Sequence, residues 1–321
     1  MTGLCSHIGT VLCFPILAIL FFYMIYGLVN CAVRIYKVFL LALMPAFYFF
    51  VTGCSNKEEG ITFPSPEGYN LNKPIVSKLP PMLDEISGIV FYPKDKSLFA
   101  IHDERGWLYK IYTDKSNKVE KWKYATGADF EDIALVDSMF FAIKSNGSIT
   151  AFTFHRPDSP IVKSFKLPKT DKREFETLFY DSARQELLMI CKDCESDEKN
   201  MTSVFAFDYK QMKYLDSPVF YIDAKNIEKK LGEKMPKFKP SAAAINPRTG
   251  ELFMISSVNK ILVIADPGGK VKDVFQLDPQ LFKQPEGLTF TPGGDLLISN
   301  ESAGIGPATI VLYKYKESPQ Q

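Results

Sequence analysis

The sequence predicts an all-β fold, a five-bladed β-propeller closed by an N-terminal strand. One motif recurs five times, opening at Ser87, Glu131, Glu176, Ser241 and Glu286. These starts are 44, 45, 65 and 45 residues apart. In each copy two short apolar runs flank a turn such as TPGGD (291–295), which is typical of a β-hairpin. A third run follows every hairpin and a fourth follows in four copies, so each copy has the strands of a propeller blade.

The fifth copy ends in YKYKESPQQ (313–321) and lacks a fourth strand. The segment NKPIVSKLP (72–80) precedes the first copy and is similar to PIVKSFKL (160–167), the fourth run of the second copy. We therefore expect the N-terminal strand to complete the last blade, which places the propeller at 71–317 and a tail at 318–321. The third copy is longer because it contains a polar, helix-like insertion, expected on one face of the propeller, at 223–237.

Two stretches near the N-terminus, residues 8–33 and 38–53, are almost free of charge. The second follows Arg34 and Lys37 and ends in FVTG directly before Cys54, as in a secretory signal. It resembles a bacterial lipobox, which implies a leader over 1–53, lipidation of Cys54 and a linker over 54–70. Two alternatives stay open: residues 1–33 precede the true start, or both stretches are transmembrane helices, of which only the first spans comfortably. Both the lipoprotein and the transmembrane interpretation tether the propeller to a membrane.

Composition excludes some functions and leaves others open. The net charge of +1 gives no basic stripe to neutralise phosphates, so we expect no nucleic-acid partner. Outside the leader and Cys54, the cysteines are Cys191 and Cys194 in CKDC. One such pair supplies too few ligands for a structural zinc site, and it forms either a local disulfide or two ordinary thiols. The sequence has no nucleophile elbow, phosphate loop or zinc-protease motif.

The motifs LDEISGIVFYP, FEDIAL, FETLFYDSARQELL, KPSAAAINPRTGELF and QPEGLTF resemble those of the SdiA-regulated family of bacterial envelope propellers. The resemblance covers nearly all of 71–317. It implies a membrane-associated propeller and no particular reaction. More distantly, the chain is similar to gluconolactonase-like and paraoxonase-like propellers, which hold Ca²⁺ in the axial channel. Their ligands do not map residue by residue onto this sequence, so that similarity implies the fold alone.

Repetition also predicts where a site lies. In a propeller blade the innermost strand runs along the axis and the second strand returns, so the start of one and the end of the other meet at one end of the channel. We call this end the mouth. The repeat starts place candidate metal ligands there, namely Glu131, Glu176 and Glu286. The expected ligand-binding residues around them are Glu85, His102, Asp103, Lys144, Lys192, Asn300 and Glu301.

Carboxylates gathered around one axis repel one another, so something must offset their charge. Three explanations stay open: Ca²⁺ held by oxygen ligands, ion pairs with Lys144 and Lys192, or a solvated mouth. His102 beside Asp103 is a weak candidate for acid–base catalysis, because a single histidine at a strand end is more often a polar rim residue.

Two functions follow as hypotheses. The first is a lipid-anchored binding module of the cell envelope, outer membrane or cell surface by preference, whose mouth recognises a small ligand or an envelope protein. The second is a Ca²⁺-dependent hydrolase of esters, lactones or phosphoesters, which needs a bound divalent ion with an open coordination position.

Overall fold

The computed structural model describes residues 62–113, 118–127, 129–156, 159–168, 172–304 and 306–317. The chain divides into two units, residues 1–61 and 62–321, and all described residues belong to the second. The predicted leader, Cys54, residues 54–61 of the predicted linker and the predicted tail at 318–321 lie outside the described residues. Among the residues described, no helix is both long and apolar enough to span a membrane.

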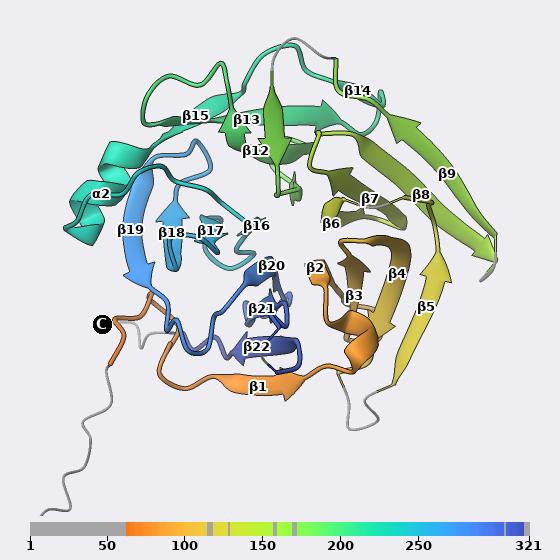
Figure 1. Ribbon diagram of the computed structural model, residues 1–321, viewed down its shortest axis with the longest axis horizontal. Helices are drawn as coiled ribbons and strands as arrows, with labels where there is room; N and C mark the ends of the chain where they lie inside the picture. Colours follow the sequence, from red (N-terminus) through yellow and green to blue (C-terminus); the bar gives the residue numbers. More distant parts are fainter. Residues whose placement is uncertain are drawn as a thin grey trace, which may run out of the picture. The chain divides into compact units, whose positions relative to one another are not determined.

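The second unit is a five-bladed β-propeller, which confirms the predicted fold (Figure 1). The first blade contains β2 (Ile86–Tyr92), β3 (Ser97–His102), β4 (Arg105–Ile111) and β5 (Val119–Lys123). The second contains β6 (Phe130–Val136), β7 (Met139–Lys144), β8 (Ile149–Arg156) and β9 (Ser159–Phe165). The fourth contains β16 (Ala242–Ile245), β17 (Leu252–Ser256), β18 (Ile261–Ala265) and β19 (Val271–Gln276). Strands within each of these sheets are antiparallel neighbours in chain order.

The last blade is closed by the N-terminal strand, as predicted. It contains β20 (Pro285–Phe290), β21 (Leu296–Asn300), β22 (Thr309–Tyr313) and, outermost, β1 (Ile75–Lys78). β1 runs antiparallel to β22, and Ile75 pairs with Leu312. Figure 1 shows the two ends of the propeller chain side by side in one sheet. Closure therefore depends on a strand of four residues at the sheet edge.

The third blade departs from the predicted pattern. Its strands are β10 (Arg173–Phe175), β11 (Phe179–Asp181), β12 (Glu186–Cys194), β13 (Met201–Asp208), β14 (Lys213–Tyr214) and β15 (Phe220–Asp223). The innermost strand is interrupted around Glu176. There the Thr177 hydroxyl accepts the Ile190 N–H at 2.7 Å, where a regular ladder would use a backbone carbonyl.

The predicted insertion of this blade contains the helix α2 (Ala224–Leu231). The Asp223 side chain caps its start by accepting the Lys225 N–H at 2.9 Å. Gly232 ends it in the left-handed region, with φ of 81°. The structure also joins Cys191 and Cys194 by a disulfide, which decides between the two alternatives for CKDC.

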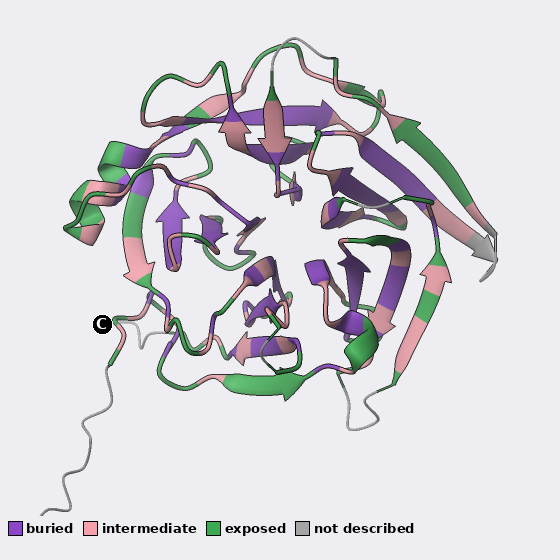
Figure 2. Cartoon of the chain, viewed as in Figure 1, coloured by how far each residue is buried: buried purple, intermediate pink, exposed green. Residues whose placement is uncertain are grey.

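The core lies between the blades, in five clusters of buried side chains. The layer between the first two blades is rich in aromatic rings, such as Tyr124 and Phe152, which stack with centroids 4.2 Å apart. Figure 2 shows the inner strands largely buried and β1 exposed. Because every inner strand is covered on both faces, its side chains become solvent-accessible mainly at the two ends of the axis.

Candidate functional site

Two of the three recurring glutamates, Glu131 and Glu286, occupy β-bulges. In the second blade Phe130 pairs with Lys144 and Asp132 with Ile143, which leaves Glu131 without an opposite residue. In the last blade Pro285 pairs with Asn300 and Gly287 with Ser299, and Glu286 is left over in the same way. A bulge releases one residue from the ladder and re-aims its side chain.

The first blade has the same irregularity. Its register shifts between Ile86 and Ile89, around Ser87. Glutamate or serine therefore fills one geometric position, and the two serine positions take part in contacts between blades. Ser241 Oγ donates to the Pro285 carbonyl at 2.6 Å, and the Ser87 carbonyl accepts from Ser299 Oγ at 2.9 Å. These bonds tie neighbouring blades together.

The position after each bulge residue is crowded, and reasoning from the sequence missed its importance. Gly88 occupies it in the first blade, and a Cβ there would lie 2.1 Å from Asp132 Oδ1. Asp132 occupies it in the second blade and is buried. Its carboxylate accepts the N–H groups of Ile133 and Leu178, each at 2.8 Å. An acid inside the apolar run FEDIALV is the signal that could have identified this structural carboxylate.

Three carboxylates meet between the first and second blades. Asp103, Asp129 and Glu131 each place one oxygen so that all three oxygens lie within 4.8 Å of one another. The backbone builds this cluster, because the Asp103 carbonyl accepts the N–H groups of Asp129 at 2.8 Å and Phe130 at 3.1 Å. The Ser145 hydroxyl in turn donates to the Asp129 carboxylate. This acidic cluster can hold a metal ion.

Ionisation of the carboxyl groups in the cluster costs free energy in the folded protein. Burial raises the pKa of Glu131 to about 8, and the neighbouring charges of Asp103 and Asp129 add to the effect. Burial also raises the pKa of Asp103, again helped by Asp129. A cation placed among these oxygens would favour the ionised carboxylates and offset their repulsion.

More acids surround the cluster. Burial raises the pKa of Glu286 to about 7. Burial, followed by a hydrogen bond with Glu85 and the charge of that residue, raises the pKa of Glu301. The charge of Asp103 contributes to both shifts, so these acids from the first and last blades share one electrostatic environment with the cluster.

Two of the predicted mouth residues are lysines, Lys192 and Lys144. Lys192 forms an ion pair with Glu176, and its charge also lowers the pKa values of Glu131 and Glu286. Of the three predicted metal ligands, Glu131 therefore belongs to the acidic cluster and Glu176 belongs to an ion pair. Lys144 lies with its ammonium 4.5 Å from the centre of the Phe130 ring.

His102 and Asn300 are more buried than the sequence predicts for ligand-binding residues. His102 is 3% exposed, and burial holds its pKa below the usual value. Its Nδ1 accepts the Glu104 N–H at 3.2 Å, so this imidazole supports the turn that carries Asp103. Asn300 donates to Thr309 Oγ1 at 3.3 Å, and no described residue is bonded to its buried Oδ1.

Fold and site together define a five-bladed β-propeller with an acidic mouth at one end of its axis. A family model described as SdiA-regulated matches residues 67–304. The chain belongs to the SdiA-regulated family. Comparison with curated proteins found no match.

Solved structures share the fold at low identity. Glutaminyl cyclase from Myxococcus xanthus aligns with a TM-score of 0.51 and 12% identity, over 76% of this chain and 96% of that one. Regucalcin from Agrobacterium tumefaciens, described as a calcium-binding protein, aligns with a TM-score of 0.47 and 10% identity over 78% and 96%. Virginiamycin B lyase from Staphylococcus aureus aligns with a TM-score of 0.41 and 13% identity over 77% and 75%. Of these, the likeness to glutaminyl cyclase bears on the fold, and it shows the fold alone.

Proposed function

We propose that this chain is a binding propeller, anchored in the cell envelope through Cys54, whose mouth binds Ca²⁺ and with it a small ligand or an envelope protein. The observation that carries the proposal is the cluster of Asp103, Asp129 and Glu131, with three oxygens within 4.8 Å of one another. Mutual repulsion and burial make the ionised carboxylates unfavourable and raise the pKa of Glu131 to about 8. A bound cation would offset this unfavourable free energy.

The donor set favours Ca²⁺ over softer metals. Ca²⁺ takes six to eight oxygen ligands in flexible geometry, and carboxylates are its usual protein ligands. Zinc prefers imidazole and thiolate, but His102 Nδ1 is already hydrogen-bonded and Cys191 is in a disulfide. Ser145, hydrogen-bonded to Asp129, adds a hydroxyl oxygen beside the cluster. Coordination positions left open by the protein are available to an anionic group of the ligand.

The test is calorimetric titration of the purified chain with Ca²⁺, together with elemental analysis. We expect saturable binding in the parent and its loss in Glu131→Gln, which keeps the shape of the side chain and removes its charge. Glu186→Gln is the matched control, because Glu186 begins β12 and Lys192, which lies at the mouth, is near the other end of that strand. This variant should bind Ca²⁺ as the parent does. Absence of binding in the parent, or equal binding in Glu131→Gln, would contradict the proposal.

Hydrolysis of an ester, lactone or phosphoester is a second candidate function. It is favoured by the carboxyl of Glu286, whose pKa of about 7 lies near neutrality, where a general acid or base works best. Aryl ester, lactone and phosphoester substrates should then be turned over in Ca²⁺ and not in EDTA, with loss of turnover in Glu286→Gln. Ca²⁺ binding without turnover of any of these substrates would contradict hydrolysis and support the binding function.

The anchor is tested separately. Mass spectrometry of the mature protein should find an acylated N-terminus at Cys54, because a lipoprotein is cleaved before that residue. Retention of residues 1–53 in the mature chain would instead support the membrane-spanning alternative.

A further inference from the structure

A cleft of about 670 Å³ lies between the last and first blades, away from the mouth. Its lining includes the turn residues Pro93, Lys96 and Gly293, which lie at the opposite ends of their strands from Asp103 and Glu301. One wall is formed by β1 and β22, and the other by β3 and β4. The volume falls within the range of about 300–1,000 Å³ that small-molecule sites occupy.

The walls of the cleft are mainly aliphatic. The aliphatic side chains along it are Ile75, Leu79, Leu98, Ile111, Val119, Leu297, Ile310 and Leu312, and two rings, those of Phe91 and Tyr112, also line it. Ile75 is 51% exposed, so apolar surface remains for a ligand to cover. A neighbouring cleft of about 490 Å³, between the first two blades, has a different lining of aromatic rings: Tyr92, Phe99, Trp122, Phe140 and Phe154. Flexible alkyl chains match the first lining better than the second.

The rim of the aliphatic cleft is positively charged. Its charged residues are Lys78, Lys96, Lys314 and Asp295. Asp295 is already engaged, because it accepts from Lys314 at 2.8 Å and from the Tyr315 N–H at 3.0 Å. Within the described ranges no ion pair joins Lys78 or Lys96 to a carboxylate, so both ammonium groups are available to an anion.

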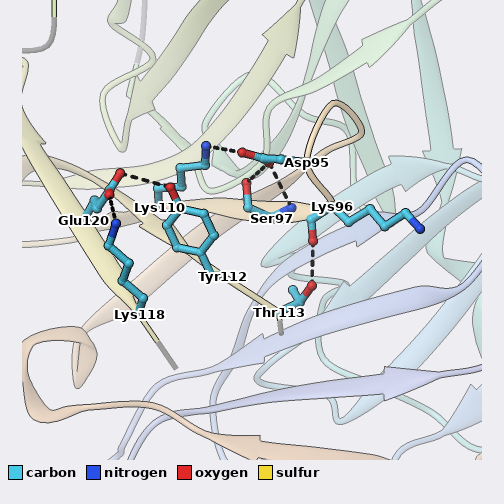
Figure 3. A network of polar contacts seen from close by, with 8 residues as sticks. All are labelled: Asp95, Lys96, Ser97, Lys110, Tyr112, Thr113, Lys118 and Glu120. Carbon is cyan, nitrogen blue, oxygen red and sulfur yellow. Dashed lines mark hydrogen bonds and ion pairs between the residues drawn. The ribbon is translucent and has the colours of Figure 1, made fainter. Parts of the chain in front are cut away.

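Of these two lysines, Lys96 is better placed to bind an anion at the rim of the cleft. Figure 3 shows a polar network on the first blade in which Lys110 pairs with Asp95 and Lys118 with Glu120. The Lys96 carbonyl belongs to this network, since it accepts from Thr113 Oγ1 at 2.6 Å. Its ammonium extends away from the network in Figure 3, and no ion pair joins it to any residue in the described ranges. The carbonyl contact fixes the backbone while leaving the charge available.

We propose that this inter-blade cleft binds an amphipathic anion, an aliphatic chain that ends in a carboxylate. The chain lies between β1 and β22 on one side and β3 and β4 on the other, and the carboxylate lies at the rim beside Lys96. The cleft is separate from the acidic mouth, so its occupancy does not depend on Ca²⁺. Because β1 is one wall, the bound anion also stabilises the strand that closes the propeller.

The alternation of β1 provides a matched pair of variants. Ser77 pairs with Ile310, lies on the same sheet face and lines the cleft. Val76 pairs with Val311 and faces the other side of the sheet, where Val311 packs between the fourth and last blades. Tryptophan is well tolerated in strands, so Ser77→Trp should fill the cleft while Val76→Trp adds the same bulk on the opposite face.

The first measurement is calorimetric titration of the whole chain in EDTA with octanoate, decanoate and dodecanoate below their micelle-forming concentrations. Each methylene buried should tighten binding by about fourfold. Dodecanol, which lacks the charge, should bind more weakly than dodecanoate. Ser77→Trp should abolish dodecanoate binding, whereas Val76→Trp and Glu131→Gln should keep it.

The charge is tested in the turn between β2 and β3. Lys96→Glu should weaken dodecanoate binding by about fivefold, the upper range for an exposed ion pair. Lys94→Glu, in the same turn but outside the cleft lining, is the control and should bind as the parent does. No saturable binding, no gain with chain length, equal binding of dodecanol, or full binding by Ser77→Trp would each overturn the proposal. Loss of Ca²⁺ binding in Glu131→Gln with dodecanoate binding kept would show that the two sites are independent.

Discussion

The same five inner strands make two chemically opposite ends of the propeller axis. At the mouth they present Glu131, Glu176 and Glu286, whereas two residues further along each strand the side chains are apolar and buried. Those second positions are Ile89, Ile133, Leu178, Ala243 and Leu288. They line a cleft of about 450 Å³ on the other side of the bulges. In the three blades that carry a glutamate, only two residues therefore separate a carboxylate at the mouth from a buried apolar side chain.

The contrast shows what a bulge does in this fold. Regular pairing would place successive side chains alternately between the blades on either side, where a carboxylate has no water. A bulge frees one residue from the ladder and lets Glu131 or Glu286 reach the channel end. Glu131 and Glu286 therefore stand where the strand is irregular. Asp132 is paired in the ladder next to Glu131, and it is tolerated there because two N–H groups are directed at its carboxylate.

The largest effect should come from crowding the mouth end of an inner strand. In Gly88→Val the new side chain would enter space held by Asp132 Oδ1, 2.1 Å from an ideal Cβ, and by the Asp132 Cα at 2.6 Å. Backbone cannot move as a flexible side chain can, so the free energy of unfolding should fall by about 3 kcal/mol or more. Chemical denaturation measures it.

Gly293→Ala is the control for the other end. A Cβ at Gly293 meets its nearest atom, Thr291 Oγ1, only at 3.7 Å, which is ordinary contact. Its stability should stay within about 0.5 kcal/mol of the parent, as for most surface changes. Equal losses in the two variants would show that the inner strands are no more tightly packed at the mouth than in an exposed turn.

A smaller effect should appear as a pH dependence confined to the mouth. In the folded, metal-free protein Glu286 and Glu131 have pKa values of about 7 and 8, whereas in the unfolded chain a glutamate has an ordinary pKa of about 4.3. Between about pH 7 and 9 the unfolded chain has already released these protons and the folded protein still releases them. Stability must therefore fall as pH rises through this window.

The measurement is the Tm in EDTA at about pH 7 and about pH 9, above the ordinary pKa of histidine at about 6.5. We expect a fall of several degrees, since about 1 kcal/mol shifts Tm by about 2–4 °C for a domain of this size. The double variant Glu131→Gln/Glu286→Gln should show a flatter profile, and Ca²⁺ should remove most of the fall in the parent. A parent profile as flat as that of the double variant would contradict the assigned pKa shifts.

The sequence predicts the fold well because the blade is a repeated local pattern. Strand, turn and strand recur at a near-constant period, and the missing fourth strand of the last copy has a visible counterpart in residues 72–80. The split strand at Glu176 could not be predicted, because it depends on the Thr177 hydroxyl taking the place of a backbone acceptor. A side-chain oxygen in such a role leaves no periodic signal.

The site was predicted less completely than the fold. Aligning the repeats placed Glu131 and Glu286 at one geometric position, which the bulges explain. The end of the second strand also placed Asp103 at the mouth, but Asp129, which precedes the motif, was missed, and the sequence did not group the two with Glu131. They come together through hydrogen bonds of the Asp103 carbonyl to the next blade, contacts that no pattern in the sequence records.

The smallest effect concerns the cationic side of the mouth. Lys192 pairs with Glu176 and also lowers the pKa values of Glu131 and Glu286, so Lys192→Met removes a charge that three carboxylates share. Metal-free stability at about pH 8 should fall by about 1 kcal/mol, near the upper limit for a partly exposed pair. Affinity for Ca²⁺ should rise, because the mouth becomes more negative.

Lys272→Met is the matched comparison, because Lys272 pairs with Glu251 alone, at 2.7 Å and with nearly half of its side chain exposed. Its stability should change less than that of Lys192→Met, because an exposed ion pair contributes little, and its Ca²⁺ affinity should not change. Chemical denaturation measures the stability of the two variants, and calorimetry measures their Ca²⁺ affinity. Together they distinguish Lys272, which forms one ion pair, from Lys192, which also changes the electrostatic potential of the mouth. Weaker Ca²⁺ binding in Lys192→Met would mean that the lysine holds Glu176 for a role in the mouth, and that the acidic cluster does not act as the cation site by itself.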